Sequence, residues 1–112
     1  MNDKVVFHLA SAWRMVNGRK LYDQIKDGTK TSEWRDATPY WFRRLLRSGN
    51  LIINTEETLN LSRSLKVHTA WFVQGYPKDN LPRLEAKITE IYLHGEIQQF
   101  EVKFTNVKEV SV

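Results

Sequence analysis

The chain has 112 residues, 41% of them hydrophobic, which suits one globular domain and is too short for two independent cores. No stretch approaches the ~20 apolar residues that a membrane-spanning helix needs, and the first residues lack the pattern of a secretory signal. The absence of cysteine excludes disulfides and thiolate metal sites. We therefore expect a single cytoplasmic domain over residues 1–112 that does not associate with membranes.

The charge is biased toward basic residues. Seventeen Lys and Arg against thirteen Asp and Glu give a net charge of +4. Such an excess is compatible with a polyanionic partner, because each phosphate that a basic side chain neutralises releases counterions. The basic clusters are Arg14, Arg19 and Lys20 before the first expected helix, and Arg43, Arg44 and Arg47 on the second.

The first third of the chain predicts a strand, a helix and a second strand. Apolar side chains alternate over residues 5–9, which is typical of a strand with one buried face. Residues 20–26 are expected to form a short helix, and Gly28 stands where a left-handed residue would end it. Residues 31–35 are rich in strand-forming side chains and follow that turn.

A second helix is expected directly afterwards. Thr38 supplies an N-cap hydroxyl and Pro39 suits the first helical position. The helix is predicted to run over residues 40–47 and to end at Gly49. Its broad apolar side consists of Trp41, Phe42, Leu45 and Leu46, and the three arginines fall on the remaining arc.

The rest of the chain reads as strands. Residues 51–53 and 70–73 are short apolar runs, and residues 55–69 suggest extended pieces. Residues 84–88 and 100–104 alternate apolar and polar side chains on either side of a turn near residues 94–95, as in a sheet with one solvated face. We predict an α+β fold: a small, mostly antiparallel β-barrel of about six strands, with two short helices closing one end. A closed barrel would also leave no exposed strand edges.

The segment from Gly28 to Arg35 concentrates charge at a helix–turn–strand junction. Strand alternation places Glu33 and Arg35 on one face, and Lys30 lies at the preceding turn. A carboxylate accepts hydrogen bonds from amino groups, and the guanidinium donates to phosphate or carbonyl oxygens. The simplest alternative is a surface ion pair worth only ~0–1 kcal/mol.

This segment resembles a known family. Gly28, Lys30, Glu33 and Arg35 match the G-x-K-x-x-E-x-R signature of ASCH domains, named after a homology region in the activating signal cointegrator. Residues 48–52 are similar to the family's "G-D-x-I" strand entry, with Asn in place of the Asp. The resemblance implies a PUA-like β-barrel related to domains that bind RNA or modified bases. It also implies that Lys30, Glu33 and Arg35 line a cleft between barrel and helices.

Aromatic side chains supply further candidates. Residues 11–19 are longer than the family's usual link, so Trp13 and Arg14 are expected to form a flap, with Trp13 as a base-stacking platform. Tyr40 is a second candidate for ligand contact. Trp34 and Trp41 are expected in the core, and one of Trp71 and Phe72 must point outward. The three histidines are too scattered for a zinc motif, and no cofactor-binding motif is present, so we expect neither metal nor cofactor.

Two functions of different classes follow. The first is a binding module for RNA or a modified nucleotide, with the bases splayed out of any duplex. Its expected binding residues are Lys30, Glu33, Arg35, Trp13, Arg14, Tyr40, Arg43, Arg44 and Arg47. A role in binding another protein through surface aromatics is a third, weaker interpretation.

The second function is a hydrolase. The resemblance implies that some ASCH proteins act as ribonucleases or as amidohydrolases on acetylcytidine. Lys30, Glu33 and Arg35 would then be catalytic, with a neutral Lys30 and with Glu33 as general base or acid. The small acetylcytidine hydrolases carry Thr where this chain has Glu33, which weakens the transfer of that activity.

Overall fold

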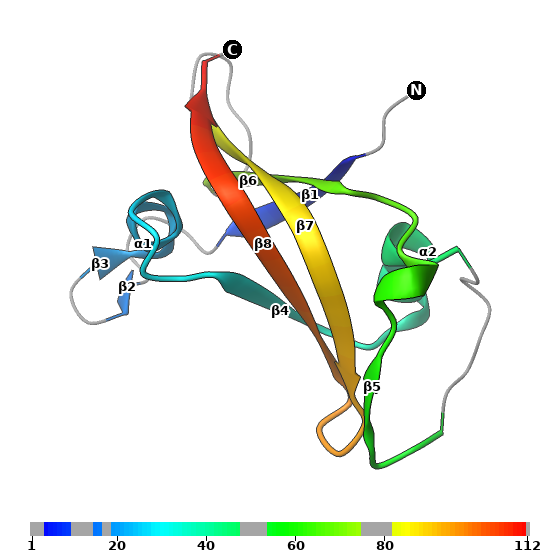
Figure 1. Cartoon of the computed structure of the whole chain (residues 1–112). Coiled ribbons are helices and arrows are strands. Elements are labelled where there is room, and N and C mark those ends of the chain that lie inside the picture. The colour runs from blue at the N-terminus through cyan, green and yellow to red at the C-terminus, as the bar shows by residue number, and fades with distance from the viewer. Residues whose placement is uncertain (1–3, 10–14, 17–18, 48–53, 75–81, 112) are drawn as a thin grey trace.

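The computed structural model describes residues 4–9, 15–16, 19–47, 54–74 and 82–111, and these form a curled main sheet, a separate two-stranded sheet and two α-helices (Figure 1). The strands are β1 (Lys4–Leu9), β2 (Met15–Val16), β3 (Arg19–Lys20), β4 (Ser32–Asp36), β5 (Thr58–Asn60), β6 (Thr69–Gln74), β7 (Arg83–His94) and β8 (Gln99–Val110). The helices are α1 (Leu21–Lys26), α2 (Pro39–Leu45) and the short 3₁₀ helix η1 (Ser62–Ser64).

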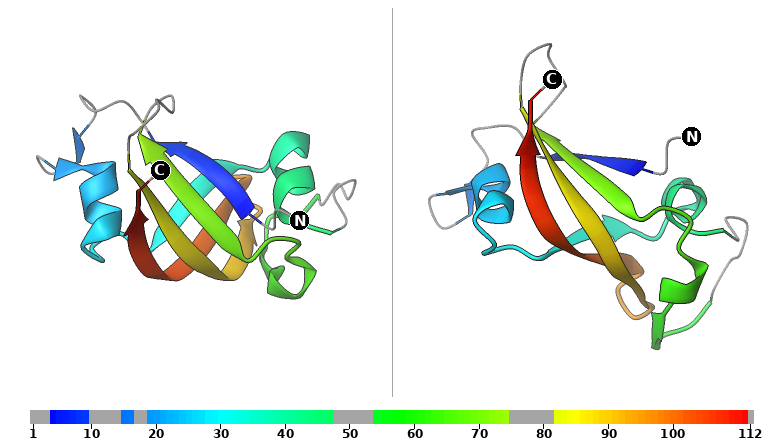
Figure 2. Two further views of the ribbon diagram at one scale, coloured as in Figure 1. Left: turned by 90° about the horizontal axis from the view of Figure 1, so that it is seen from above. Right: turned by 45° about the horizontal axis from the view of Figure 1, so that its top comes forward.

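The main sheet has the strand order β1-β6-β7-β8-β4, and β5 adds to β7. Every pair in it is antiparallel except β1 with β6, which run parallel. The sheet curls into a half-barrel (Figure 2). The predicted α+β class and mainly antiparallel sheet are confirmed. In the described part of the chain, however, β1 and β4 end the strand order and share no ladder, so the predicted closure is not seen.

The helices differ from the prediction. Both helices were expected to close one end of the barrel, but they lie at opposite ends of the curled sheet (Figures 1 and 2). The reason is the strand between them: β4 runs from the end of α1 to the start of α2, and an extended segment separates its ends by about 3.3 Å per residue.

The core lies inside the curl. The alternation predicted for β1, β7 and β8 is confirmed, since Phe7, Leu84 and Phe100 are fully buried. Phe72 points inward and Trp71 outward, with the Trp71 indole N–H donating to Glu85 at 3.0 Å. Phe7 stacks on both Phe72 and Trp41, with ring centroids 5.5 Å and 5.4 Å apart. Aromatic packing therefore ties β1 to β6 on one side and to α2 on the other.

The prediction for Trp34 is wrong. Its side chain is 36% exposed on the outer face of the sheet, where it stacks on His94 with centroids 4.8 Å apart. Alternation placed Trp34 opposite Glu33 correctly, but Glu33, which pairs with the buried Val102, takes the inward face. Its neighbour must therefore face outward.

The helix ends follow local chemistry. Gly28 has a φ of 85°, the left-handed conformation expected after α1. The Thr38 hydroxyl accepts a hydrogen bond from the Trp41 N–H at 3.4 Å, which confirms the predicted N-cap. The second helix is shorter than predicted, because Leu46 is extended and bridges to Leu65. Gly49 and the expected strand at residues 51–53 lie outside the described residues.

Helix α1 is attached to β8 by polar contacts. The buried Tyr22 hydroxyl donates to Glu109 at 2.7 Å, and the Lys26 ammonium lies 3.2 Å from the same carboxylate. These two partners hold the pKa of Glu109 below its usual range. Burial and the Glu109 contact raise the pKa of Tyr22 above its ordinary value. These contacts fix α1 against β8 just before the turn that leads to β4.

The stability of the α1 attachment should depend on pH. A carboxylate whose pKa is lowered by folding stabilises the fold above its unfolded pKa, and this contribution is lost as pH falls through the folded value. We expect Glu109→Gln to be less stable than wild type at pH 7 in urea unfolding, with the difference shrinking toward pH 3. The exposed Glu96→Gln is the control and should follow the wild-type curve. A constant difference between Glu109→Gln and wild type at all pH values would contradict this assignment.

Gly95 should not tolerate a side chain. A Cβ built at this turn would lie 2.7 Å from the Glu57 carbonyl oxygen and closer still to that of Thr55. The Gly95 N–H also donates to Glu57 at 2.9 Å, so neither backbone can easily move. We expect Gly95→Ala to cost about 1–3 kcal/mol in urea unfolding. The neighbouring Glu96→Ala should change stability by less than about 0.5 kcal/mol. Equal stability of the two variants would be the opposite result.

Candidate functional site

The structure brings the three charged residues of the motif together at Glu33. The Glu33 carboxylate is buried, with the Lys30 ammonium at 3.4 Å and the Arg35 guanidinium at 3.2 Å on its other oxygen. It also accepts the Trp34 N–H at 3.1 Å. With all three side chains charged, the cluster has a net charge of +1. Burying a carboxylate is costly unless it is paired and hydrogen-bonded, and here both conditions are met.

The turn after α1 positions Lys30. The Asp27 carboxylate accepts the Thr29 N–H at 2.9 Å, and the Lys30 N–H donates back to the Gln24 carbonyl at 3.0 Å. Together with the left-handed Gly28, these bonds reverse the chain so that Lys30 meets Glu33 three residues later. Lys30 also lines a hollow of about 270 Å³ between the end of α1 and β8.

Arg35 spans the gap between the two terminal strands of the sheet. One guanidinium nitrogen donates to its neighbouring Trp34 carbonyl at 2.8 Å, and the other donates across to the His8 carbonyl of β1 at 3.3 Å. The guanidinium carbon lies 5.0 Å from the Phe7 ring centroid and 5.5 Å from that of Trp41. These are cation–π distances. One arginine thus joins β4, β1 and the aromatic side of α2.

A pocket of about 490 Å³ opens beside Arg35, and we call it the β1–α2 pocket. Its lining is Lys4, Val5, Val6, His8, Arg35, Tyr40, Trp41 and Arg44. As far as the chain is described, every charged or titrating group in this lining other than the Tyr40 phenol is Lys, Arg or His, and no carboxylate is among them. The Arg44 guanidinium lies 5.0 Å from the Tyr40 ring centroid, and that ring meets Trp41 edge-on at 5.0 Å. The pocket therefore combines positive charge with aromatic surface.

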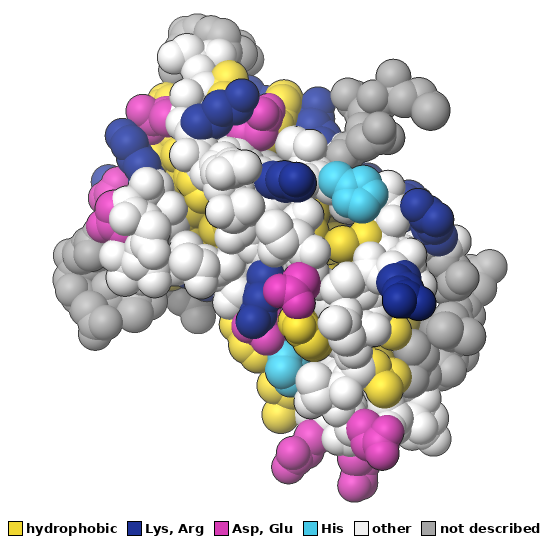
Figure 3. Space-filling view, in the orientation of Figure 1, with side chains coloured by type: hydrophobic (Ala, Val, Ile, Leu, Met, Phe, Trp, Pro, Cys, Tyr) yellow, Lys and Arg dark blue, Asp and Glu magenta, His cyan; other side chains and the backbone are white. Residues whose placement is uncertain are grey.

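The charge distribution agrees with this lining. On the face drawn in Figure 3, Lys and Arg side chains lie over the α2 side without Asp or Glu beside them, and Asp and Glu alone lie at the end that carries the β7–β8 turn. Both signs are mixed over the rest of that face. An anionic ligand would therefore be attracted toward the α2 side.

The remaining predicted residues divide into three groups. Tyr40 and Arg44 line the β1–α2 pocket. Arg43 and Arg47 are exposed but are not among its lining residues. Trp13 and Arg14 lie outside the described residues.

The sequence prediction missed part of the pocket. Lys4 was not singled out, and Trp41 was assigned to the core alone, although it packs on Phe7 and lines the pocket as well. The alternation in β1 did indicate that the His8 side chain lies on the face opposite to the buried Phe7. No spacing rule connects Lys4 to α2, because the two meet only through the fold.

No protein-family model, curated protein or solved structure matches this chain. Among the described residues, no three His, Cys, Asp or Glu side chains gather closely enough to hold a metal ion. None of the helices described has the length and apolar character needed to cross a membrane.

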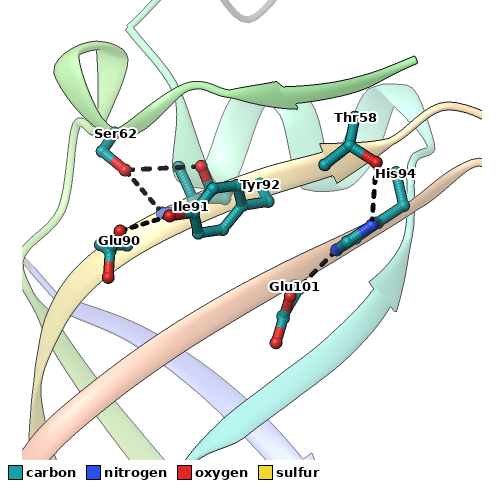
Figure 4. Close-up of polar contacts among 7 residues, drawn as sticks. All are labelled: Thr58, Ser62, Glu90, Ile91, Tyr92, His94 and Glu101. Carbon is teal, nitrogen blue, oxygen red and sulfur yellow. Dashed lines mark hydrogen bonds and ion pairs between the residues drawn. The ribbon is translucent and has the colours of Figure 1, made fainter.

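A second polar cluster lies on the outer face of the sheet (Figure 4). The His94 ring bonds Glu101 at 2.9 Å through Nε2 and meets the Thr58 hydroxyl at 3.4 Å through Nδ1. Nearby, the Ser62 hydroxyl accepts the Ile91 N–H at 3.0 Å. These contacts join β5 and η1 to β7, and His94 also supports the exposed Trp34 ring.

Glu33 should stabilise the fold through its two cations. Replacing it by the isosteric Gln removes the charge and leaves Lys30 and Arg35, each only about one-fifth exposed at 22% and 21%, without their counter-ion. We expect Glu33→Gln to lower the free energy of unfolding by about 2 kcal/mol, less than for a fully buried pair because of this partial exposure. Asp36→Asn, an exposed change on the same strand, should cost less than about 0.5 kcal/mol. Urea unfolding at pH 7 compares them, and equal values would show that the ion pairs contribute nothing.

Proposed function

We propose that the protein binds a nucleotide, free or within single-stranded RNA, in the β1–α2 pocket. The observation that carries the proposal is the lining itself, in which Arg35 lies beside the Trp41 ring and Arg44 beside the Tyr40 ring. Lys4 also belongs to the lining, and its ammonium lies 3.8 Å from the Trp71 ring centroid. Guanidinium and ammonium groups suit phosphate oxygens, and aromatic rings suit the face of a base. The volume of about 490 Å³ lies within the range of small-ligand pockets.

A single-stranded or free nucleotide fits better than a duplex. Tyr40 and Trp41 offer ring surface at a recessed site, and a base can reach such surface only when it is unpaired and unstacked. Tyr40 is the more accessible of the two rings, at 49% exposed. The phosphate contacts would give affinity for any sequence, and the ring contacts would favour single strands.

We further propose that the chain is an ASCH-type domain. The supporting observations are the motif residues and the helix–turn–strand context in which they occur. In this proposal Glu33 orients Arg35 toward the ligand, and Lys30 completes the charge cluster from the other side. The curled, mainly antiparallel sheet with two helices is compatible with a PUA-like barrel.

The second candidate is a hydrolase of RNA or of a modified nucleoside such as acetylcytidine. The observation in its favour is the Lys30–Glu33 pair, which offers an amine and a carboxylate 3.4 Å apart. Against it, Lys30 lines the smaller hollow near α1 and is not among the residues of the β1–α2 pocket. Binding is therefore the function that the geometry supports better.

Two neighbouring arginines make a matched test of binding. Arg44 lines the pocket and Arg43, the preceding residue, does not. We expect Arg44→Ala to weaken binding of a labelled single-stranded RNA by about tenfold in fluorescence anisotropy, and Arg43→Ala by less than about threefold. The affinity of wild type should fall as salt rises. Equal loss in both variants would place the ligand elsewhere, and no binding at low salt would reject the proposed function.

The same samples separate binding from hydrolysis. We expect acetylcytidine and the labelled RNA to remain intact after incubation with the wild-type protein. Product that appears with wild type and disappears with Lys30→Ala would favour the hydrolase instead. Circular dichroism of each variant controls for loss of the fold.

A further inference from the structure

Strand β1 forms one wall of the β1–α2 pocket. In the described part of the chain β1 ladders with β6 alone, so its other edge carries no strand. The strand contributes Lys4, Val5, Val6 and His8 to the pocket lining. The edge of a sheet offers backbone N–H and C=O groups that a ladder has not used.

The contact of Arg35 with β1 shows which of these groups face the pocket. Its guanidinium reaches the His8 carbonyl from β4, on the side of β1 away from β6. In a strand, the N–H and C=O of one residue point to the same side, and successive residues alternate. The N–H and C=O of Val6, two residues from His8, therefore also point away from β6. The backbone groups of Val5 and Phe7 point toward the β6 ladder.

We propose that the Val6 peptide groups pair with the Watson–Crick edge of a nucleobase held in the β1–α2 pocket. This inference rests on the proposed function and adds how the base is recognised. A donor beside an acceptor matches that edge, which carries an N–H or NH2 group next to a ring nitrogen or carbonyl oxygen on every common base. The ligand class is thus a nucleotide whose Watson–Crick edge is free and unmodified.

An extended peptide fits this edge less well. Adding a strand to β1 would need a continuous row of backbone groups, but Arg35 already occupies the His8 carbonyl. Only a short stretch around Val6 remains, between the guanidinium and the start of β1. A planar heterocycle needs no more than one donor and one acceptor, and the aromatic rings of Tyr40 and Trp41 lie in the same pocket.

Modified nucleotides test the proposal without changing the protein. Uridine 5′-monophosphate keeps its N3–H donor, and N3-methyluridine 5′-monophosphate loses it and gains a methyl group at the same place. Adenosine 5′-monophosphate and its N1-methyl derivative form a second pair. In whichever pair binds, we expect the unmethylated nucleotide to bind at least about tenfold more tightly than its methylated derivative, as measured by calorimetry. In ¹⁵N-resolved NMR, the Val6 amide should shift on binding more than the Val5 amide.

A variant tests the same contact from the protein side. Val6→Pro removes the N–H, and proline is tolerated on an edge strand where that N–H faces away from the ladder. We expect it to lose at least about tenfold in affinity, whereas Val6→Ala, which keeps the N–H, stays within about threefold of wild type. If Val6→Pro fails to fold, replacing the Val6 amide by an ester removes the same donor without the proline ring.

The outcomes separate this inference from the proposed function. If none of the four common nucleoside monophosphates, nor the labelled RNA, binds wild type, the proposed function fails and the inference with it. If they bind and Arg44→Ala weakens them, but methylation and Val6→Pro do not, the pocket is right and recognition by Val6 is wrong. Binding of an extended peptide in place of nucleotides, with a shift of the Val6 amide, would also overturn the inference.

Discussion

The interaction on which the rest of the site depends is the ion pair between Glu33 and Arg35. An arginine placed among Phe7, Trp41 and the β1 backbone loses much of its hydration, which is costly for a full charge. A buried carboxylate 3.2 Å away offsets that cost, and the aromatic faces add cation–π attraction. With the guanidinium held there, the two terminal strands of the sheet are connected by a side chain where no backbone ladder is described.

This arrangement explains why the pocket is both basic and aromatic. The curl of the sheet brings β1 beside the end of β4, and α2 begins directly after β4. Charged residues from three elements thus line the same pocket as the Tyr40 and Trp41 rings, and Trp41 also packs against the core by stacking on Phe7. Arg35 serves both roles, since its guanidinium has five N–H donors and can hold protein carbonyls while facing a ligand. The outer face, with Trp34 on His94, is a separate surface whose contacts join strands.

Elements with strong local signals were predicted well. The strands β1, β7 and β8 follow their alternation, and the caps at Thr38 and Gly28 adopt the expected geometry. The errors share one cause, which is that contacts outside the local sequence pattern decided the outcome. Trp34 was placed in the core because strand parity puts it on the face opposite the charged Glu33, yet the inward face of β4 was taken by Glu33, whose burial depends on two cations. Helix α2 ended early because Leu46 pairs with Leu65, a partner nineteen positions away in the printed sequence.

By itself, the sequence determined the strands β1, β4, β7 and β8, the two α-helices, and that Glu33 and Arg35 share a face, because alternation and capping act over a few residues. It also determined the basic excess and the motif at the turn. The tertiary structure alone decided which face of β4 is buried, that the helices lie at opposite ends of the curled sheet, and that residues of β1 and α2 line one pocket. These outcomes depend on the curl of the sheet and on contacts between distant residues, and no local pattern encodes such contacts.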